Sequence, residues 1–568
     1  MSISVKATSF LDKFKSSNGR PLRVLFLGNI ACNSYNNAKI LRARGVDAYV
    51  ITPNDFFVMS NPAWENQDVE IEFEKSFFPD WHGIGVTPEV PEWYVQGLME
   101  PCIDYVGALM SGEKKQASLI RESMAFYERL TTSPHAYKNE WQSFLANNDD
   151  YYRPSPKYFA TWLKGERPPN VAEHATRPAF TLPSLANVTK YFRRYFGAQF
   201  TWLKNNTIAL RQFISSIAAH KTEFEEFASW EGAFFPIEKI SERSNYPKLK
   251  FWREIYKRSL PNRIDDLQMA DLTIWSSYAA KWRALFQHMD VVIATATYGA
   301  IPLLCGYKNY LTYEHGTLRD IPFAEDGQGR VCSLTYAFSK MTFVTNSDVL
   351  SQAKKLISNQ SKIVCLPHAI DSDQLLSIGS QEKNNDPNTA VKLFAPARHD
   401  WAIKGNYKII EAFAKIIKVQ GDVKLFLVEW GGEVERTKKL IQDLGLTSSV
   451  EWMLPCSKPI LRQHMRSSLA VLDQFELEAF GTTTVEALAS AVPIITRVNE
   501  REMKNFFGET PPVINCSSPE NIFENVVELI HNPEKKTVYG AKGKKWISEF
   551  HSADLICSRQ LEAIADAF

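Results

Sequence analysis

The chain has 568 residues, of which 45% are hydrophobic and 23% are charged. These proportions are ordinary for a globular protein, and the length is too great for a single domain core. The formal net charge of +1 gives no strong global field, which argues against binding of nucleic acid or acidic lipid through overall charge. The composition predicts two main domains and an insertion.

The sequence shows no targeting or membrane-spanning segment. The first residues contain no apolar stretch of the kind found in a secretory signal, and no run reaches the about 18–20 apolar residues that a spanning helix needs. The eight cysteines are dispersed without a C-x-x-C pair, which favours reduced thiols over disulfides or a zinc site. We therefore expect a cytoplasmic protein.

The first recognisable unit is a β-α-β pattern near the beginning of the chain. PLRVLFLGN predicts a buried parallel strand, IACNSYNN a loop, AKILRARG a helix that ends at Gly45, and VDAYVITP a second strand. Such a unit opens a doubly wound α/β domain, in which the loop after the first strand faces the ligand.

From about residue 62 to residue 275 the α/β rhythm is lost. The segment is rich in Trp, Tyr and Phe interleaved with Lys, Arg and Glu at helical spacing. We interpret most of it as a helical insertion whose aromatic residues form a core. The alternative is a surface that binds an acceptor or, peripherally, a membrane. Nucleic-acid binding, another use of basic and aromatic residues, has no further support in the sequence.

The rhythm returns at MDVVIATATYGAIPLL and continues through KNYLTYEHGT, MTFVTNSDVL and SKIVCLPHAID. After the polar stretch GSQEKNNDPNTAV, which is typical of a linker, six short apolar runs predict a second doubly wound domain: KLFAPARHD, KLFLVEWGG, SVEWMLP, LAVLDQF, VPIITR and PPVIN. The predicted boundaries are an N-terminal domain over 1–370, a linker over 371–390, a C-terminal domain over 391–535 and a terminal helix over 536–568.

The stretch EAFGTTTVEALASAVPII carries acids at Glu478 and Glu486, with seven residues between them. Thr483 and Glu486 fit a capping box, in which Glu486 only bonds back to the cap amide. In the functional alternative, the helix start offers unpaired N–H groups and a positive dipole end to a diphosphate, and Gly481 permits its close approach. The two acids would then bind sugar hydroxyls on either side of that diphosphate.

Two cations follow the first strand of the second domain. Arg398 ends the strand in KLFAPAR, and Lys404 stands six residues later, before a helix. A guanidinium and an ammonium at the carboxyl end of a strand suit a diphosphate. Either alone is typical of a solvated surface, but both together with the acid–glycine–acid stretch favour a nucleotide-diphosphate site.

The ordered set of motifs resembles the family 4 retaining glycosyltransferases of GT-B fold. ARHDWAIKG, LFLVEWGGEVERTKKLIQDLGLTSSVEWMLP and ILRQHMRSSLAVLDQFELEAFGTTTVEALASAVPIITR carry the resemblance over about residues 393–530, including an E-x7-E motif. The N-terminal half matches only through the first β-α-β unit and the EHG after YLTY. The resemblance implies two Rossmann-like domains that face a cleft, with the C-terminal helix crossing back onto the N-terminal domain.

The resemblance also implies a role for each matching residue. Arg398 and Lys404 would clamp the donor diphosphate and stabilise the departing group, Glu478 would face the donor sugar, and Glu486 would bind the ribose. The other implied contacts are Phe480, Gly481, Thr482 and Thr483 for sugar and phosphate, Leu454 and Pro455 for the nucleobase, Gly28 and Asn29 in the cleft-facing loop of the N-terminal domain, and His315 near the reacting centre.

Four residues have an alternative interpretation. His315 also fits a hydrogen-bonded histidine at a strand end, and His368, in the interdomain crossover, is interpreted as structural or as part of a hinge. Asp371 and Asp373 form a D-x-D like the metal-binding motif of another glycosyltransferase fold, but they lie in the same crossover. Because Arg398 and Lys404 already neutralise a diphosphate, we predict no metal and no other cofactor.

The implied activity is transfer of a sugar from a nucleotide-diphosphate sugar to a glycan, lipid-linked or other hydroxyl acceptor, with retention of anomeric configuration, in surface polysaccharide or glycoconjugate biosynthesis. A sugar phosphorylase or a sugar-nucleotide epimerase of the same fold is one alternative. A non-catalytic scaffold that binds glycans or nucleotides is the other. The expected partners are the nucleotide sugar and the acceptor.

Overall fold

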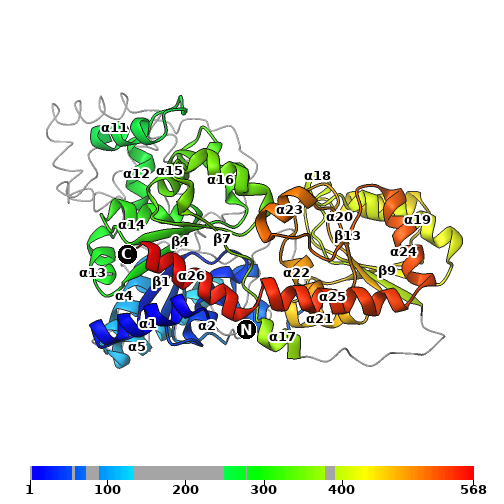
Figure 1. The fold of residues 1–568 in the computed structure, drawn as a ribbon, viewed down its shortest axis with the longest axis horizontal. Coiled ribbons are helices and arrows are strands. Elements are labelled where there is room, and N and C mark those ends of the chain that lie inside the picture. Colours follow the sequence, from blue (N-terminus) through cyan, green and yellow to red (C-terminus); the bar gives the residue numbers. More distant parts are fainter. Residues whose placement is uncertain are drawn as a thin grey trace.

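The computed structural model describes residues 3–53, 58–71, 89–132, 249–276, 278–377 and 390–567. These residues form two lobes, each built on a parallel sheet with helices on both faces (Figure 1). The prediction of two doubly wound α/β domains is confirmed, and a pair of such lobes is the GT-B architecture.

The N-terminal lobe contains a seven-stranded parallel sheet in the order β3-β2-β1-β4-β5-β6-β7. Its strands are β1 (Arg23–Leu27), β2 (Asp47–Pro53), β3 (Tyr94–Gly97), β4 (Val291–Thr295), β5 (Tyr310–Tyr313), β6 (Thr342–Val344) and β7 (Ile363–Cys365). Apolar runs in the sequence predicted every strand except β3. This edge strand lies inside the range interpreted as mostly a helical insertion, so part of that range belongs to the sheet.

The helices of the N-terminal lobe cover both faces of its sheet. They are α1 (Val5–Asn18), α2 (Asn33–Arg42), α3 (Pro62–Asn66), α4 (Met99–Met110), α5 (Lys114–Thr132), α11 (Leu249–Ser259), α12 (Met269–Trp275), α13 (Ala279–Phe286), α14 (Ala300–Leu304), α15 (Gly327–Phe338) and α16 (Leu350–Leu356). The short helix α17 (Ser372–Ser377), which follows β7, packs against helices of the C-terminal lobe instead. Helix α2 begins within the stretch predicted as a loop after β1.

Alternation along β1 shows how one strand serves two cores, because successive residues of a strand point to opposite faces. Val24 and Phe26 pack with α1, α2 and the C-terminal helix, whereas Leu25 and Leu27 pack with α4 and α13. A strand buried on both faces must be apolar throughout, which is why it is visible as a continuous run in the sequence.

The C-terminal lobe contains a six-stranded parallel sheet in the order β10-β9-β8-β11-β12-β13. Its strands are β8 (Val391–Ala395), β9 (Val423–Val428), β10 (Val450–Met453), β11 (Ala470–Leu472), β12 (Ile494–Thr496) and β13 (Ile514–Asn515). Its helices are α18 (Trp401–Lys404), α19 (Asn406–Val419), α20 (Val434–Asp443), α21 (Lys458–Arg466), α22 (Thr482–Ala489), α23 (Glu500–Phe507), α24 (Pro519–His531) and α25 (Glu534–Phe550). All six strands coincide with the predicted apolar runs.

Two crossovers join the lobes. The first follows β7, and the second lies between α25, which packs on α22, and α26 (Ala553–Ala567), which packs on α1 and α2 (Figure 1). The crossovers are bonded to each other, because the Ala553 N–H donates to Ser372 Oγ at 2.9 Å and His551 Nδ1 donates to the His368 carbonyl oxygen at 3.1 Å. The end of the chain therefore ties the two lobes together.

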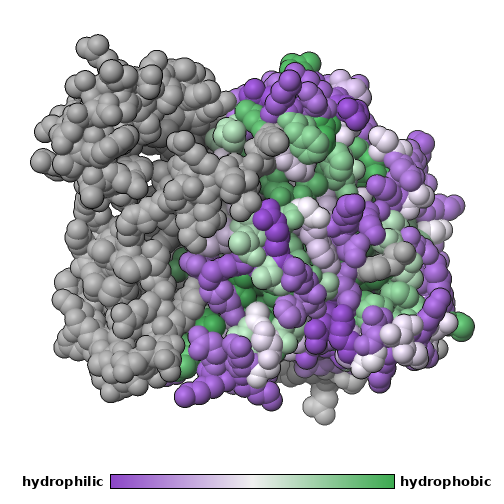
Figure 2. All heavy atoms as spheres, turned by 90° about the vertical axis from the view of Figure 1, so that its left-hand side faces the viewer, coloured by the Kyte–Doolittle hydropathy of each residue, from purple (hydrophilic) through white to green (hydrophobic). Residues whose placement is uncertain are grey.

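Within the described part of the chain, no helix combines the length and the apolarity needed to cross a membrane. Figure 2 looks onto the end of the N-terminal lobe, where described hydrophilic and hydrophobic residues are interspersed. Residues 133–248, which include most of the aromatic segment, lie outside the described residues. The expectation of an acceptor or membrane surface concerns that segment and stays a prediction.

Close packing of α25 on the C-terminal lobe gives a prediction about stability. A Cβ at Gly540 would lie 2.4 Å from the carbonyl oxygen of Ala491. Gly540→Ala should lower the free energy of unfolding by about 1–3 kcal/mol, because overpacking outweighs the gain of about 1 kcal/mol in helix propensity. Urea denaturation measures the change.

Gly421→Ala is the matched control, since a Cβ at Gly421 meets no atom within 4 Å. This variant should stay within about 0.5 kcal/mol of the wild type. Equal stabilities of the two variants would contradict the packing of α25 described here.

Candidate active site

Three segments of the C-terminal lobe meet at the carboxyl ends of its parallel strands. Arg398 lies in the loop after β8, Lys404 ends α18, and residues 473–481 connect β11 to α22. The N–H of Phe475 donates to the carbonyl oxygen of Lys404 at 2.9 Å, which ties the third segment to α18. Because ligands of open α/β sheets bind at this edge, the three segments form the candidate site.

The charge of an N-terminal-lobe arginine, Arg319, also acts on Lys404, although the ion-pair partner of Arg319 is Asp348 at 2.6 Å. Burial lowers the pKa of Lys404; the charge of Asp473 opposes this change, whereas the charges of Arg398 and Arg319 add to it. The Lys404 ammonium donates to the side-chain oxygen of Gln474. Arg319 follows β5 and was not predicted from the sequence. A bound diphosphate would relieve the repulsion among the three cations.

Asp473 is a buried acid at the base of these loops. Thr484 Oγ1 donates to its Oδ2 at 2.9 Å, and its Oδ1 has no hydrogen-bond partner among the described residues. Burial raises the pKa of the Asp473 carboxyl, while the charge of Lys404 and the bond from Thr484 oppose the rise. Sequence analysis missed this residue, although an acid directly after the apolar run LAVL was the signal for it.

Helix α22 begins without a side-chain cap. Gly481 is the N-cap residue, no described side chain caps the helix, and Glu486 is bonded to Arg462, so the capping-box interpretation of Glu486 is wrong. Thr482 and Thr483 form the first turn, whose N–H groups keep their donor capacity. The Phe480 ring is buried against Phe507 at 5.8 Å between ring centroids, so its backbone is the part that can face a ligand.

The structure places the two acids of the E-x7-E stretch in different surroundings. The Glu478 side chain is 43% exposed and accepts from Arg497 and from Asn499 Nδ2. Glu486 is 1% exposed and accepts from Arg462 Nε at 2.5 Å and Nη2 at 3.1 Å. Glu478 therefore lies open to a ligand, whereas Glu486 lies within a protein ion network.

That network contains Glu65 of α3, Lys458 and Arg462 of α21, and Glu486 of α22, and we call it the interlobe ion cluster. Lys458 Nζ is 2.7 Å from Glu65 Oε2 and 3.5 Å from Glu486 Oε1, and Arg462 Nη2 is 3.4 Å from Glu65 Oε1. Burial raises the pKa of Glu486, but the charges of Arg462 and Lys458 outweigh it and hold the pKa below the ordinary value. No motif in the sequence indicated this pairing.

Residues 58–71 of the N-terminal lobe, which we call the interlobe strap, lie along the predicted nucleobase position. The Ile71 N–H donates to the carbonyl oxygen of Pro455 at 2.9 Å. Leu454 beside it is 42% exposed. Of the two predicted base contacts, Pro455 thus has its carbonyl bonded to the strap, while the Leu454 side chain stays open to solvent.

Gly28 and Asn29 are engaged within the N-terminal lobe. Gly28 has a φ of +81°, and a Cβ there would lie 2.2 Å from Thr295 Oγ1, so the position requires glycine. Asn29 is fully buried; its Nδ2 donates to the carbonyl oxygen of Ser60 at 2.7 Å, and its Oδ1 accepts from the Tyr35 N–H at 3.0 Å. Asn29 therefore anchors the interlobe strap.

His315 follows β5 at the boundary between the lobes. Its ring lies 3.0 Å from Asn33 Nδ2 and packs edge-on against His368, with 5.3 Å between ring centroids. Burial, with smaller contributions from the charges of Arg319 and Lys458, lowers the pKa of His315 to about 4. At neutral pH the imidazole is uncharged and bonded to Asn33. His368 is buried between the crossovers.

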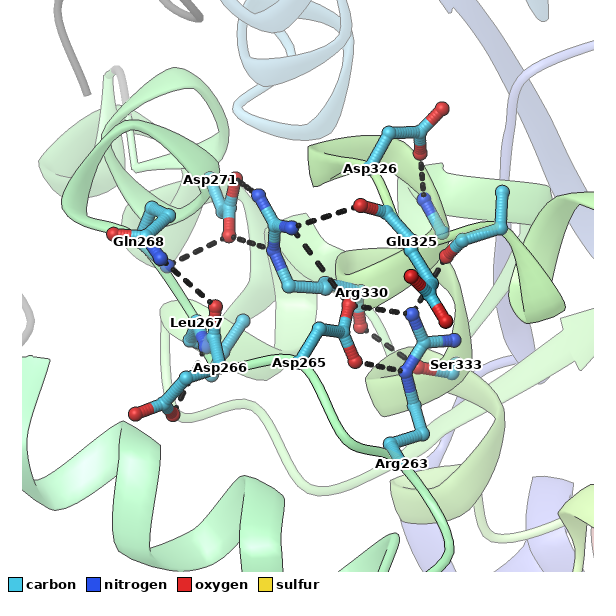
Figure 3. A network of polar contacts seen from close by, with 12 residues as sticks. Arg263, Asp265, Asp266, Leu267, Gln268, Asp271, Glu325, Asp326, Arg330 and Ser333 are labelled. Atoms are coloured by element: carbon cyan, nitrogen blue, oxygen red, sulfur yellow. Dashed lines mark hydrogen bonds and ion pairs between the residues drawn. The ribbon is translucent and has the colours of Figure 1, made fainter. Parts of the chain in front are cut away.

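A network of charged residues holds the loop that follows Arg319 (Figure 3). Arg263 donates to the carbonyl oxygen of Ala324 at 2.6 Å. Arg330 of α15 pairs with Asp271 of α12 at 2.7 Å (Figure 3). The chain that returns from residue 249 onward thus fixes the loop that carries the third cation.

The D-x-D pair is engaged by cations of the N-terminal lobe. Asp371 pairs with Lys39 at 2.6 Å, and Asp373 is 3.7 Å from Arg44. Among the described residues, no group of three or more His, Cys, Asp and Glu side chains has the arrangement to hold a metal ion. Both aspartates therefore act in ion pairs between the first crossover and α2 or the turn after it.

The C-terminal lobe is similar to a family of known proteins. Residues 379–546 match the family model described as glycosyl transferases group 1. This lobe matches a glycosyltransferase family. The matched range contains the loops that carry Arg398, Lys404 and Glu478, and it ends within α25.

Individual relatives share part of the chain. An exopolysaccharide phosphotransferase from Streptomyces coelicolor is 28% identical over 160 residues, which is 28% of this chain and 17% of that protein. The match therefore spans about a sixth of the relative's length. HepE from Anabaena, solved with UDP and glucose, is 15% identical, with 51% of this chain and 81% of HepE covered at a TM-score of 0.41. TarM from S. aureus is 14% identical, with 50% of this chain and 58% of TarM covered at a TM-score of 0.38.

Removal of one charge from the interlobe ion cluster should strongly lower the stability of the protein. Arg462→Met leaves two buried carboxylates with one ammonium and should lower the free energy of unfolding by about 3–5 kcal/mol. Lys439→Met is the control, because the Lys439–Asp443 pair is exposed and should contribute at most about 1 kcal/mol. Equal urea midpoints for the two variants would contradict the burial of the cluster.

The lowered pKa of His315 predicts a pH dependence of stability. Between pH 6.5 and about 4, the unfolded chain binds a proton at His315 that the folded chain does not, so the free energy of unfolding falls as pH falls. One histidine contributes about 1.4 kcal/mol per pH unit. His315→Asn should reduce the slope by this amount in urea titrations at pH 7, 6 and 5; an unchanged slope would refute the prediction.

Proposed function

We propose that this chain is a glycosyltransferase that moves a sugar from a nucleotide-diphosphate sugar to a hydroxyl group of a glycan or lipid-linked acceptor. The observation that carries the proposal is the placement of Arg398 and Lys404 at the carboxyl edge of the C-terminal sheet, next to the start of α22. The match of this lobe to the glycosyl transferases group 1 family supports it.

The proposed roles follow from charge and exposure. Arg398, which is 40% exposed and paired with Asp400 at 3.1 Å, and Lys404 bind the diphosphate together with the N–H groups of α22. They also stabilise the negative charge that grows on the leaving group. Glu478 lies open to the sugar hydroxyls, and Glu486 keeps acceptor capacity toward the ribose.

The proposed reaction is a front-face displacement with retention of anomeric configuration. The bond between the anomeric carbon and the diphosphate oxygen breaks, a bond from the acceptor oxygen to the same carbon forms, and the acceptor proton passes to the departing phosphate oxygen. The neutral His315 ring offers one donor and one acceptor near the lobe boundary. With Arg398 and Lys404 opposite the diphosphate, the reaction as proposed uses no metal.

The acceptor is proposed to be a growing polysaccharide or a lipid-linked glycan. The exopolysaccharide phosphotransferase from Streptomyces coelicolor supports the setting of polysaccharide biosynthesis. Its name also states a different transferred group. Product mass therefore belongs in the assay, because a transferred sugar and a transferred sugar phosphate differ by one phosphate.

Calorimetry with UDP, GDP, ADP and their common sugars tests the donor site. At least one nucleoside diphosphate should bind the wild type, and Arg398→Ala should weaken that binding about tenfold or more, because it removes a charge-assisted contact. Lys415→Ala, an exposed cation of α19 paired with Glu520, should bind like the wild type.

Turnover with the bound donor then separates the alternatives. Transfer to a glycan acceptor supports the proposal. Turnover of a sugar phosphate without nucleotide would instead identify a phosphorylase, and donor conversion without acceptor an epimerase. Binding without any turnover would favour a scaffold, and absence of nucleotide binding would refute the donor site.

A further inference from the structure

The interlobe strap is fixed to the N-terminal lobe at its first half. Ser60 accepts through its carbonyl oxygen from Asn29 Nδ2 at 2.7 Å and from the Tyr94 hydroxyl at 2.9 Å. Asn66 Nδ2 donates to the Tyr35 hydroxyl at 2.8 Å. The strap therefore moves with the loop after β1 and with α2.

The second half of the strap is bonded to the C-terminal lobe. Glu70 and Cys456 form an antiparallel bridge. The Ser457 N–H donates to the Val69 carbonyl oxygen at 2.8 Å, and the Val69 N–H donates to Ser457 Oγ at 3.0 Å. Residue pairs more than 380 positions apart in the chain thus form a small sheet-like contact beside α21.

The strap also brings the fourth charge to the interlobe ion cluster. The C-terminal lobe alone supplies two cations, Lys458 and Arg462, and one carboxylate, Glu486. Glu65 supplies the second carboxylate and is 4% exposed. Since buried charges are costly unless they are paired, the cluster is balanced only while the strap is docked.

The two distances at Lys458 indicate what Glu65 does for Glu486. The ammonium is 2.7 Å from Glu65 and 3.5 Å from Glu486. Arg462 already donates one hydrogen bond to each carboxylate oxygen of Glu486. If Glu65 lost its charge, Glu486 would be the remaining partner of the ammonium, which would then occupy a further acceptor position on Glu486 Oε1.

We propose that Glu65 is a positioning residue for the donor site: from the opposite lobe, it draws Lys458 away from Glu486 and so keeps that carboxylate able to accept hydrogen bonds from the ribose hydroxyls of the nucleotide. This inference rests on the proposed function. It makes the docked strap a condition for full recognition of the ribose, and it couples the arrangement of the lobes to donor binding.

The test compares a ribonucleoside diphosphate with its 2′,3′-dideoxy counterpart by calorimetry. The probe is UDP, GDP or ADP, whichever binds the wild type most tightly. The wild type should prefer the ribonucleotide about tenfold or more, because bonds to a charged acceptor are lost in the dideoxy form. Glu65→Gln should remove most of this preference while leaving the affinity for the dideoxynucleotide nearly unchanged.

A second variant separates positioning from simple support of the fold. Glu65→Gln combined with Lys458→Met removes the ammonium that would otherwise move onto Glu486, so the preference for the ribonucleotide should return. Glu411→Gln, at an exposed position of α19, controls for the loss of one carboxylate. In turnover, Glu65→Gln should raise the KM for the donor with little change in kcat.

Other outcomes would refute the role of Glu65, the ribose role of Glu486 or the proposed function. Equal weakening of both nucleotides by Glu65→Gln, or no recovery in the double variant, would reduce Glu65 to a structural residue. A wild type that binds both nucleotides equally would refute the ribose role of Glu486 and with it this inference, while the donor site would stand. A wild type that binds neither would refute the proposed function itself.

Discussion

The arrangement of the two lobes depends on a balance of buried charge. Lys458, Arg462 and Glu486 lie side by side in the C-terminal lobe, and their sum is one positive charge. Glu65 cancels that charge from the N-terminal lobe. Because an unpaired buried ion costs several kcal/mol, the cluster favours the geometry in which the strap is docked, and the candidate site takes its shape within that geometry.

Two other contacts also stabilise this arrangement of the two lobes. A hydrophobic cluster is continuous across the boundary, with Val349 of the N-terminal lobe and Met503 of α23 among its members. The bonded crossovers hold the opposite side of the boundary, where His368 and His551 are buried. Lobe movement in an enzyme of this fold would have to pivot on the crossovers and break the strap or the cluster.

The sequence correctly predicted the location of residues that lie in loops directly after a strand. Arg398 and Lys404 lie at the carboxyl edge because a parallel strand places its following loop there, and Glu478 lies open beside them. Their roles in binding stay predictions. Glu486 and Asn29 have the same kind of local signature, yet their polar atoms are bonded to protein groups.

The residues that sequence analysis missed share a cause. Arg462 and Glu65 are 397 positions apart, and neither stands in a pattern that distinguishes a buried ion from a solvated one. Arg319 is held by its ion pair with Asp348, while Arg263 and Arg330 hold the loop that follows it. Such contacts depend on how elements pack together, and packing between distant elements produces no recognisable pattern in the sequence of either one.

The sequence by itself determined the two doubly wound sheets, since strands buried on both faces must be continuous apolar runs bounded by turns. It also determined which loops stand at the carboxyl edge. Only the tertiary structure decided which charges are exposed and which are neutralised, because burial and partner choice depend on how the lobes and the strap come together. For this protein, that difference separates Glu478, open to a ligand, from Glu486, held within the interlobe ion cluster.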